Sequence, residues 1–136
     1  LSALQAEFSQ LCDAEADRPA LAQMASVVQA RLGEWRELST EVIAACQRDP
    51  QEIGATSVDF LQYSAYVLLA GFWLQAAARA QDALEAGSGE AAFYQAKLHS
   101  ADFYLRRVLP RASAHREALL GGAQCLMAMD EGSFAF

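Results

Sequence analysis

Apolar residues recur along this chain at helical spacings, and no useful stretch alternates with the period of two that a half-buried strand shows. The first stripe consists of residues three and four apart: Leu1, Leu4, Phe8 and Leu11. It predicts an amphipathic helix over residues 2–15. A new helix should begin at residues 17–19, because Pro19 fits the first turn of a helix.

A seven-residue repeat predicts a longer second helix over residues 19–48. One heptad position is apolar throughout and holds Leu21, Val28, Trp35 and Val42. The second holds Met24, Leu38 and Ala45, with Arg31 as the exception. Such a seam is typical of a helix packed nearly parallel or antiparallel to its neighbours. The helix should end at Asp49-Pro50, because proline pushes the preceding residue out of the α region.

The third predicted helix, over residues 56–85, is apolar on nearly every face between Phe60 and Ala80. Its start resembles a capping box, with Thr56 and Asp59 satisfying free N–H groups. A helix that is apolar all round is usually covered by other elements, so we expect it at the centre of the bundle. Gly71 would allow a neighbouring helix to approach closely, and the turn 87–89 ends the helix.

A fourth helix should begin near Gly89 and carries the most regular stripe: Ala91, Tyr94, Leu98, Ala101, Leu105 and Val108. Pro110 must kink or break it. A further helical piece over 111–120 should stop at Gly121-Gly122, one or two turns follow over 123–129, and 130–136 is irregular. We expect Leu98 and Leu105 to be buried together with Leu68 and Phe72. The prediction is an all-α antiparallel bundle of about four main helices, a single domain over residues 1–136.

Composition narrows the possible functions. The net charge of −7 argues against nucleic acid and anionic lipid as partners. The longest apolar run, residues 65–74, is too short to span a membrane. Three widely spaced cysteines, Cys12, Cys46 and Cys125, do not form a disulfide framework, which suits a reducing cytoplasm. The chain opens without Met, as if cut from a longer protein, and its 54% hydrophobic content suggests that apolar surface is hidden against another domain or subunit.

The candidate chemical groups are few. His99 and Asp102 lie one helical turn apart, but no Glu-x-x-His pair of a di-iron bundle occurs, and His115 lies beyond Pro110. Lys97 before His99, and Ser100 and Ala101 after it, do not match a phosphorylated-histidine module. No nucleophile elbow or phosphate loop is present either. We therefore predict no catalytic, cofactor-binding or metal-binding residue in this chain.

Two clusters leave alternatives open. The aromatic residues over 60–73 and 93–104 fit core and interface packing, with a ligand slot between helices as the alternative. The basic group Arg106, Arg107 and Arg111 fits contacts with nearby acids or a helix C-terminus, with phosphate or carboxylate binding as the alternative. The glutamates read as surface or capping carboxylates: Glu34, Glu37, Glu41, Glu52, Glu85, Glu90 and Glu117.

Three stretches carry a family resemblance: residues 59–74, residues 93–111 and residues 126–129. Together they resemble the C-terminal helical domain found on the large acyl-CoA dehydrogenase subfamily. The resemblance implies a parent enzyme that oxidises an acyl-CoA thioester at its α,β carbons. In such enzymes FAD takes the hydride, a Glu removes the α proton and an electron-transfer flavoprotein is the usual acceptor. Those groups belong to the preceding part of the enzyme, so no catalytic residue is carried onto this chain.

The resemblance implies an accessory or oligomerisation domain that packs on the dehydrogenase body of the same chain and on a second subunit, as a homodimer. Phe93 and Phe103, and Trp73 if the central helix is incompletely covered, would then form exposed contact surface. The alternative is a free-standing helical module that binds an apolar ligand or a partner helix. A complete small enzyme is the least favoured interpretation.

Overall fold

The computed structural model describes residues 2–87 and 89–134, and every regular element in them is helical. The long helices are α1 (Ser2–Glu15), α2 (Ala22–Arg48), α3 (Gln51–Glu85), α4 (Ala91–Phe103) and α5 (Ala112–Leu120). A π-helical segment, Tyr104–Val108, and a 3₁₀ turn, Leu109–Arg111, join α4 to α5. The short α6 (Gln124–Met127) and a 3₁₀ turn, Glu131–Phe134, follow. The expected all-α bundle is thus confirmed.

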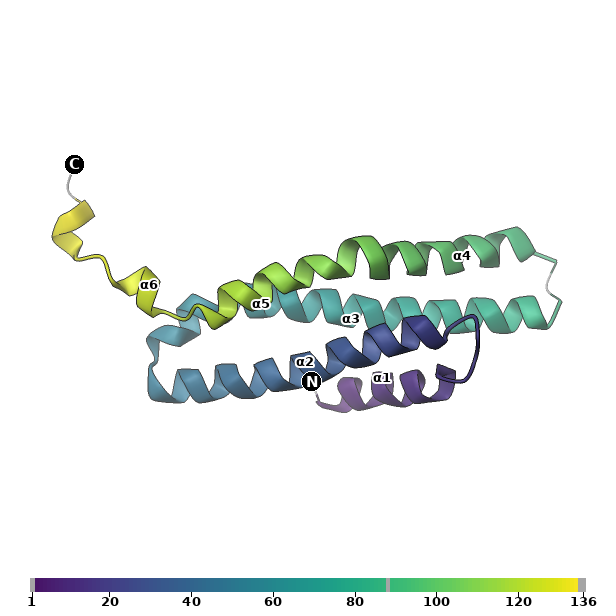
Figure 1. Cartoon of the computed structure of the whole chain (residues 1–136), viewed down its shortest axis with the longest axis horizontal. Helices are drawn as coiled ribbons and strands as arrows, with labels where there is room; N and C mark the ends of the chain where they lie inside the picture. Colours follow the sequence, from purple (N-terminus) through teal and green to yellow (C-terminus); the bar gives the residue numbers. More distant parts are fainter. Residues whose placement is uncertain (1, 88, 135–136) are drawn as a thin grey trace.

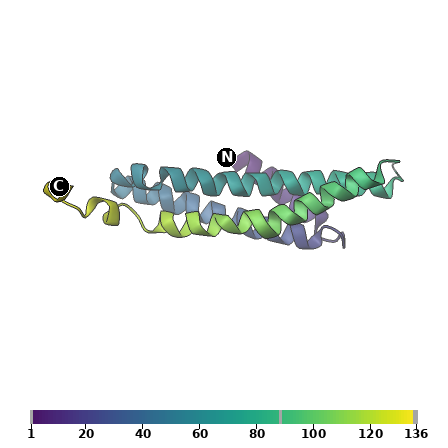
Figure 2. The ribbon, with the colours of Figure 1, turned by 90° about the horizontal axis from the view of Figure 1, so that it is seen from above.

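Helices α1, α2 and α3 and the rod formed by α4 and α5 each run antiparallel to the one before along the length of the bundle (Figure 1). The continuous α4–α5 rod lies against α3, α3 lies against α2, and α1 folds back along α2. Because α3 also packs against α1, α4 and α5, it is the central helix, as predicted. Beyond Gly122 the chain leaves the bundle, and α6 projects past its end in both views (Figures 1 and 2).

The core forms where the predicted stripes meet. Trp35 and Leu32 of α2, Tyr63 and Val67 of α3, and Phe8 of α1 are all fully or almost fully buried. The heptad seam of α2 is therefore largely confirmed, although Met24, Val42 and Ala45 are only partly buried. Close approach at Gly71 is also confirmed, because a Cβ atom there would collide with the ring of Phe8.

Two predicted helix starts are wrong. Helix α3 begins at Gln51, five residues before Thr56, and the Asp49 carboxylate accepts a hydrogen bond from the Gln51 N–H at 3.0 Å. The Thr56 hydroxyl donates to the backbone oxygen of Glu52 inside the helix, so it caps nothing. Helix α2 begins at Ala22, and Pro19 lies in the preceding turn. The turn before α3 is therefore shorter than predicted, whereas the turn before α2 is longer.

Proline 110 is accommodated by a change of helix type. Its ring would clash with the carbonyl group four residues earlier in a regular α-helix. The preceding turn is π-helical, with the Leu109 N–H bonded to the Tyr104 oxygen, and this wider turn removes the conflict. The predicted kink near Pro110 is confirmed, and it takes the form of a π-helical segment followed by a 3₁₀ turn.

The expected joint burial of four core residues is only partly correct. Leu105 is buried, and Leu68 packs beside the same core cluster. Leu98 is half-buried against a second cluster built around Leu21 and Ala101. Phe72 is 49% exposed, although its ring contacts that of Phe8 edge-on. The prediction therefore fails for Phe72.

Candidate functional site

The polar side chains between α2 and α3 form a structural clamp. The Tyr63 hydroxyl donates to Glu34 Oε2 at 2.6 Å, and Arg31 Nη1 donates to the same oxygen at 2.6 Å. Burial opposes ionisation of Glu34, but the hydrogen bonds from Tyr63 and Arg31 outweigh it and hold the pKa of Glu34 below its ordinary value. Burial and the contact with Glu34 raise the pKa of Tyr63. Near neutral pH the carboxylate is thus charged, the phenol is protonated, and neither is poised to exchange protons.

The two histidines do not form a metal site with the acids near them. His115 Nδ1 lies 2.8 Å from Asp59 Oδ1, and its ring stacks on Tyr66, so it links α5 to α3. Asp102 accepts a hydrogen bond from Arg106 Nε at 2.6 Å, while His99 is exposed on the next turn. Within the described ranges no three His, Cys, Asp or Glu side chains converge as metal ligands do. The pairing of Arg106 with a nearby acid matches the predicted role of that basic group.

The cysteines differ in accessibility. Burial raises the pKa of the Cys12 thiol to about 11, so this group stays protonated and unreactive at neutral pH. Cys46 is half-buried on α2, and Cys125 is exposed on α6. All three are free thiols.

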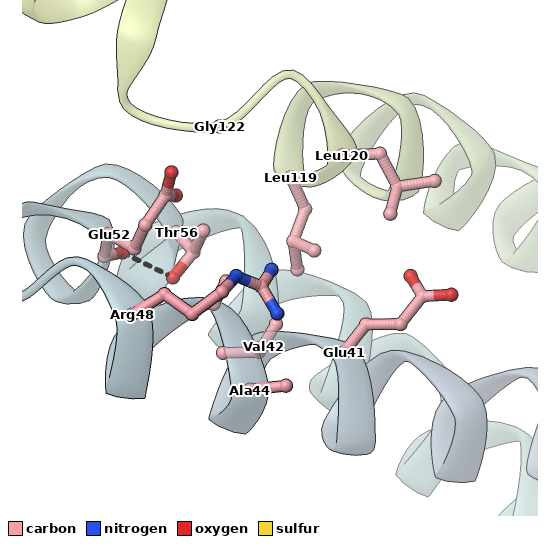
Figure 3. A pocket seen from close by; sticks show the side chains of 10 residues that line it. Glu41, Val42, Ala44, Arg48, Glu52, Thr56, Leu119, Leu120 and Gly122 are labelled. Atoms are coloured by element: carbon pink, nitrogen blue, oxygen red, sulfur yellow. Dashed lines mark hydrogen bonds between the residues drawn. The ribbon is translucent and has the colours of Figure 1, made fainter.

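A cavity of about 350 Å³ lies where the end of α2, the start of α3 and the α5–α6 turn meet (Figure 3). Its apolar wall includes Val42 and Leu119, and the Arg48 side chain lies between the carboxylates of Glu41 and Glu52. Glu52 Oε1 accepts a hydrogen bond from the Ala123 N–H at 3.1 Å, so this carboxylate holds the chain where it leaves α5. Through this hydrogen bond Glu52 anchors the exit of the C-terminal segment at the edge of the cavity.

The most distinctive surface is a row of large apolar side chains along α3. Successive residues of a helix turn by about 100°, so positions 58, 61, 69 and 72 lie on one side. All four side chains on this side are exposed, with Leu61 at 66%: Val58, Leu61, Leu69 and Phe72. We call this row the α3 face. Sequence reasoning missed it, because α3 was expected to be covered on every side.

A groove next to the α3 face lies between α3 and α4. It has a volume of about 270 Å³, and its lining includes Phe72 and Arg79 of α3 and Phe93 and Lys97 of α4. Lys97 Nζ lies 5.0 Å from the centroid of the Phe93 ring. The predicted exposure of Phe93 and Phe103 is confirmed, whereas Trp73 is partly buried against the core. An apolar row beside a groove with two cations is suited to contact with another polypeptide.

The described helices include none that combines the length and the apolar character needed to cross a membrane. Among the described residues, the α3 face and the adjoining groove are the strongest candidate for a functional surface, ahead of the cavity and the polar clusters.

Comparison with known families agrees with the resemblance drawn from the sequence. A family model described as "Acetyl-CoA dehydrogenase C-terminal like" matches residues 4–130. No curated protein matches the chain. The matched range contains all five long helices almost completely, together with α6, and it includes both the α3 face and the groove.

Proposed function

Because the chain belongs to the acyl-CoA dehydrogenase C-terminal-like family, we propose that it is a non-catalytic accessory domain of an FAD-dependent acyl-CoA dehydrogenase-type enzyme. In this role it packs on the dehydrogenase body and on a second subunit. The body carries out the α,β-oxidation of the acyl-CoA thioester. The helical domain contributes contact area and holds the subunits together.

The observation that carries this proposal is the exposed α3 face. Four large apolar side chains in one row are costly to leave in water, since burying one such side chain is worth about 1.5–3 kcal/mol. A helix at the centre of a bundle would not be expected to keep such a row unless another surface covers it. Family membership then supplies the class of surface: an acyl-CoA dehydrogenase body or a second subunit.

The polar groups support a non-catalytic role. Glu34 and Tyr63 are bonded to each other, His115 is bonded to Asp59, and Asp102 is bonded to Arg106. Each of these groups therefore has a structural partner on the same or a neighbouring helix. Catalysis of acyl-CoA oxidation needs a base beside the α carbon and a flavin beside the β carbon, and both are assigned to the body in this proposal.

The proposal predicts that the purified chain is colourless and does not oxidise acyl-CoA. Reconstitution with excess FAD followed by gel filtration measures the first property, and acyl-CoA-dependent reduction of an artificial electron acceptor measures the second. A flavin absorbance equal to one cofactor per chain would contradict the proposal. The coding sequence upstream of Leu1 gives an independent check, because the proposal requires a dehydrogenase body in the same reading frame.

A further inference from the structure

Two positively charged side chains line the groove between α3 and α4, which lie side by side (Figure 1). Arg79 belongs to α3 and Lys97 belongs to α4, and among the described residues neither forms an ion pair. Like charges on neighbouring helices repel each other, so leaving both without an anion is unfavourable. This is unexpected in a chain whose acidic residues outnumber its basic ones, with a net charge of −7.

The acidic side chains nearest to these cations along the two helices are engaged elsewhere. Asp82, one turn beyond the α3 cation, accepts a hydrogen bond from Arg18 at 2.8 Å. Asp102, just over one turn beyond the α4 cation, accepts a hydrogen bond from Arg106 at 2.6 Å. The groove therefore presents positive charge that the described part of the chain leaves uncompensated, and an anionic ligand would complement it.

The same groove presents aromatic rings to solvent. Phe72 is 49% exposed and Phe93 is 54% exposed. The ring of Tyr94 meets that of Phe93 edge-on, with 5.3 Å between the centroids, and so supports it from the side. Lys97 Nζ lies 5.0 Å from the Phe93 centroid. A flat ring that stacks here would therefore place an anionic group attached to it within reach of the ammonium group.

A phosphorylated nucleoside matches both features of the groove. Its base is a flat ring of the kind that stacks on aromatic side chains, and its phosphate is attached one sugar away. A fatty acid offers an anion without a ring, and inorganic phosphate would leave the exposed rings in water. The volume of about 270 Å³ is at the small end for ligand pockets and suits a single nucleotide. The net charge of −7 argues against a polynucleotide.

We propose that the groove between α3 and α4 binds a phosphorylated purine nucleoside, with the base against Phe72 and Phe93 and the phosphate groups on Arg79 and Lys97. The amide of Gln75, which also lines the groove, can donate to and accept from the edge of the base. The choice of source rests on the proposed function, because acyl-CoA ends in an adenosine that carries a 3′-phosphate and a 5′-diphosphate. A free adenine nucleotide is the other source of the same chemistry.

Isothermal titration calorimetry at low salt tests the groove with CoA, adenosine 3′,5′-bisphosphate, ADP, adenosine and inorganic phosphate. We expect one phosphorylated nucleoside per chain, bound at least about tenfold more tightly than adenosine or phosphate, because each of these lacks one half of the contacts. Equal binding of CoA and the 3′,5′-bisphosphate, both tighter than ADP, would identify CoA as the source. Binding of ADP that is as tight or tighter would identify a free nucleotide.

Substitutions in the groove locate the site. Arg79→Gln and Lys97→Gln should each weaken binding of the phosphorylated probes at least about tenfold and leave the binding of adenosine unchanged. Phe93→Ala should weaken adenosine and the nucleotides alike. The matched controls are Arg107→Gln and Phe103→Ala, which change exposed side chains of the same kinds outside the groove lining and should bind as the parent chain does. Circular dichroism checks that each variant is folded.

The outcomes separate this site from the proposed function. If no phosphorylated nucleoside binds at millimolar concentration, or if the control variants lose as much binding as the groove variants, the nucleotide site is overturned and the accessory role stands. A flavin that the Arg79→Gln, Lys97→Gln double variant retains through gel filtration would instead contradict the accessory role. This variant lacks the charges that would hold the adenosine diphosphate part of FAD in the groove, so the two results are independent.

Discussion

At the scale of single residues, buried polar side chains set how α2 and α3 pack. Trp35 Nε1 donates to Ser64 Oγ at 2.8 Å, and Ser64 in turn donates to the Phe60 backbone oxygen. The adjacent Glu34 accepts the hydrogen bonds of Tyr63 and Arg31. None of these partnerships follows from periodicity, because a helical repeat predicts which residues face inward but gives no pairing between helices.

Replacing Glu34 with Gln should destabilise the fold by about 1–2 kcal/mol, at the lower end for bonds to a charged group because the site is partly exposed. The effect should depend on pH. The folded-state pKa of Glu34 lies below its ordinary value of 4.5, so the carboxylate stabilises the fold above pH 4.5 and this contribution is lost as pH falls through the folded-state pKa. Urea unfolding at several pH values measures the difference.

Glu37→Gln is the matched control, because Glu37 lies one turn further along α2 and is exposed. Its unfolding free energy should match that of the parent chain at every pH. A loss for Glu34→Gln that is the same at pH 7 and at pH 3 would contradict the ionic role assigned to this carboxylate.

Replacement of two glycines with Ala should change the stability of the fold in opposite directions. At Gly71 the new methyl group would meet the buried ring of Phe8, so overpacking should cost about 1–3 kcal/mol. At Gly33, in the middle of α2, no atom lies within 4 Å of the new position, so Gly33→Ala should stabilise the chain by about 0.5–1 kcal/mol. Thermal unfolding measures both. Equal shifts of the same sign would contradict the close packing of α1 on α3.

At the scale of elements, the stripes in the sequence predicted most helices and the break near Pro110. The helix starts were less predictable, because the capping signal at Thr56 occurs inside α3 and the true start relies on Asp49. The π-helical segment was also beyond sequence reasoning. The Tyr104 hydroxyl donates to the Tyr66 backbone oxygen at 3.0 Å, which fixes Tyr104 against α3. The wider π-helical turn accommodates Pro110 while Tyr104 keeps this contact.

Leu105, within the π-helical segment, should be essential to this junction. It is 6% exposed and belongs to the main core, so Leu105→Ala should cost about 2–5 kcal/mol. Phe103→Ala, two residues earlier, should change stability by less than about 0.5 kcal/mol, because that ring is 60% exposed. Denaturant midpoints distinguish them, and an unchanged midpoint for Leu105→Ala would mean that the junction is packed differently.

At the scale of the whole molecule, composition and periodicity predicted a central helix and excess apolar surface, but they missed the part of that surface that lies on α3. Phe93 and Phe103 were expected to be exposed, whereas Phe72 was expected in the core. The reason is that α1 is only fourteen residues long and covers one part of α3. How far a short helix shields its neighbour depends on its placement, which a stripe of apolar residues does not specify.

Light scattering of the purified chain over a range of micromolar concentrations would show whether the α3 face is an association surface. The mass should rise from 14.7 kDa toward twice that value. Leu61→Gln, on the α3 face, should keep the chain monomeric while circular dichroism shows that its helical fold is unchanged. Ile43→Gln, at a similarly exposed position on α2, should leave the dimer intact. A mass of 14.7 kDa at every concentration, together with no binding of a hydrophobic dye, would contradict the assignment of the α3 face as an association surface.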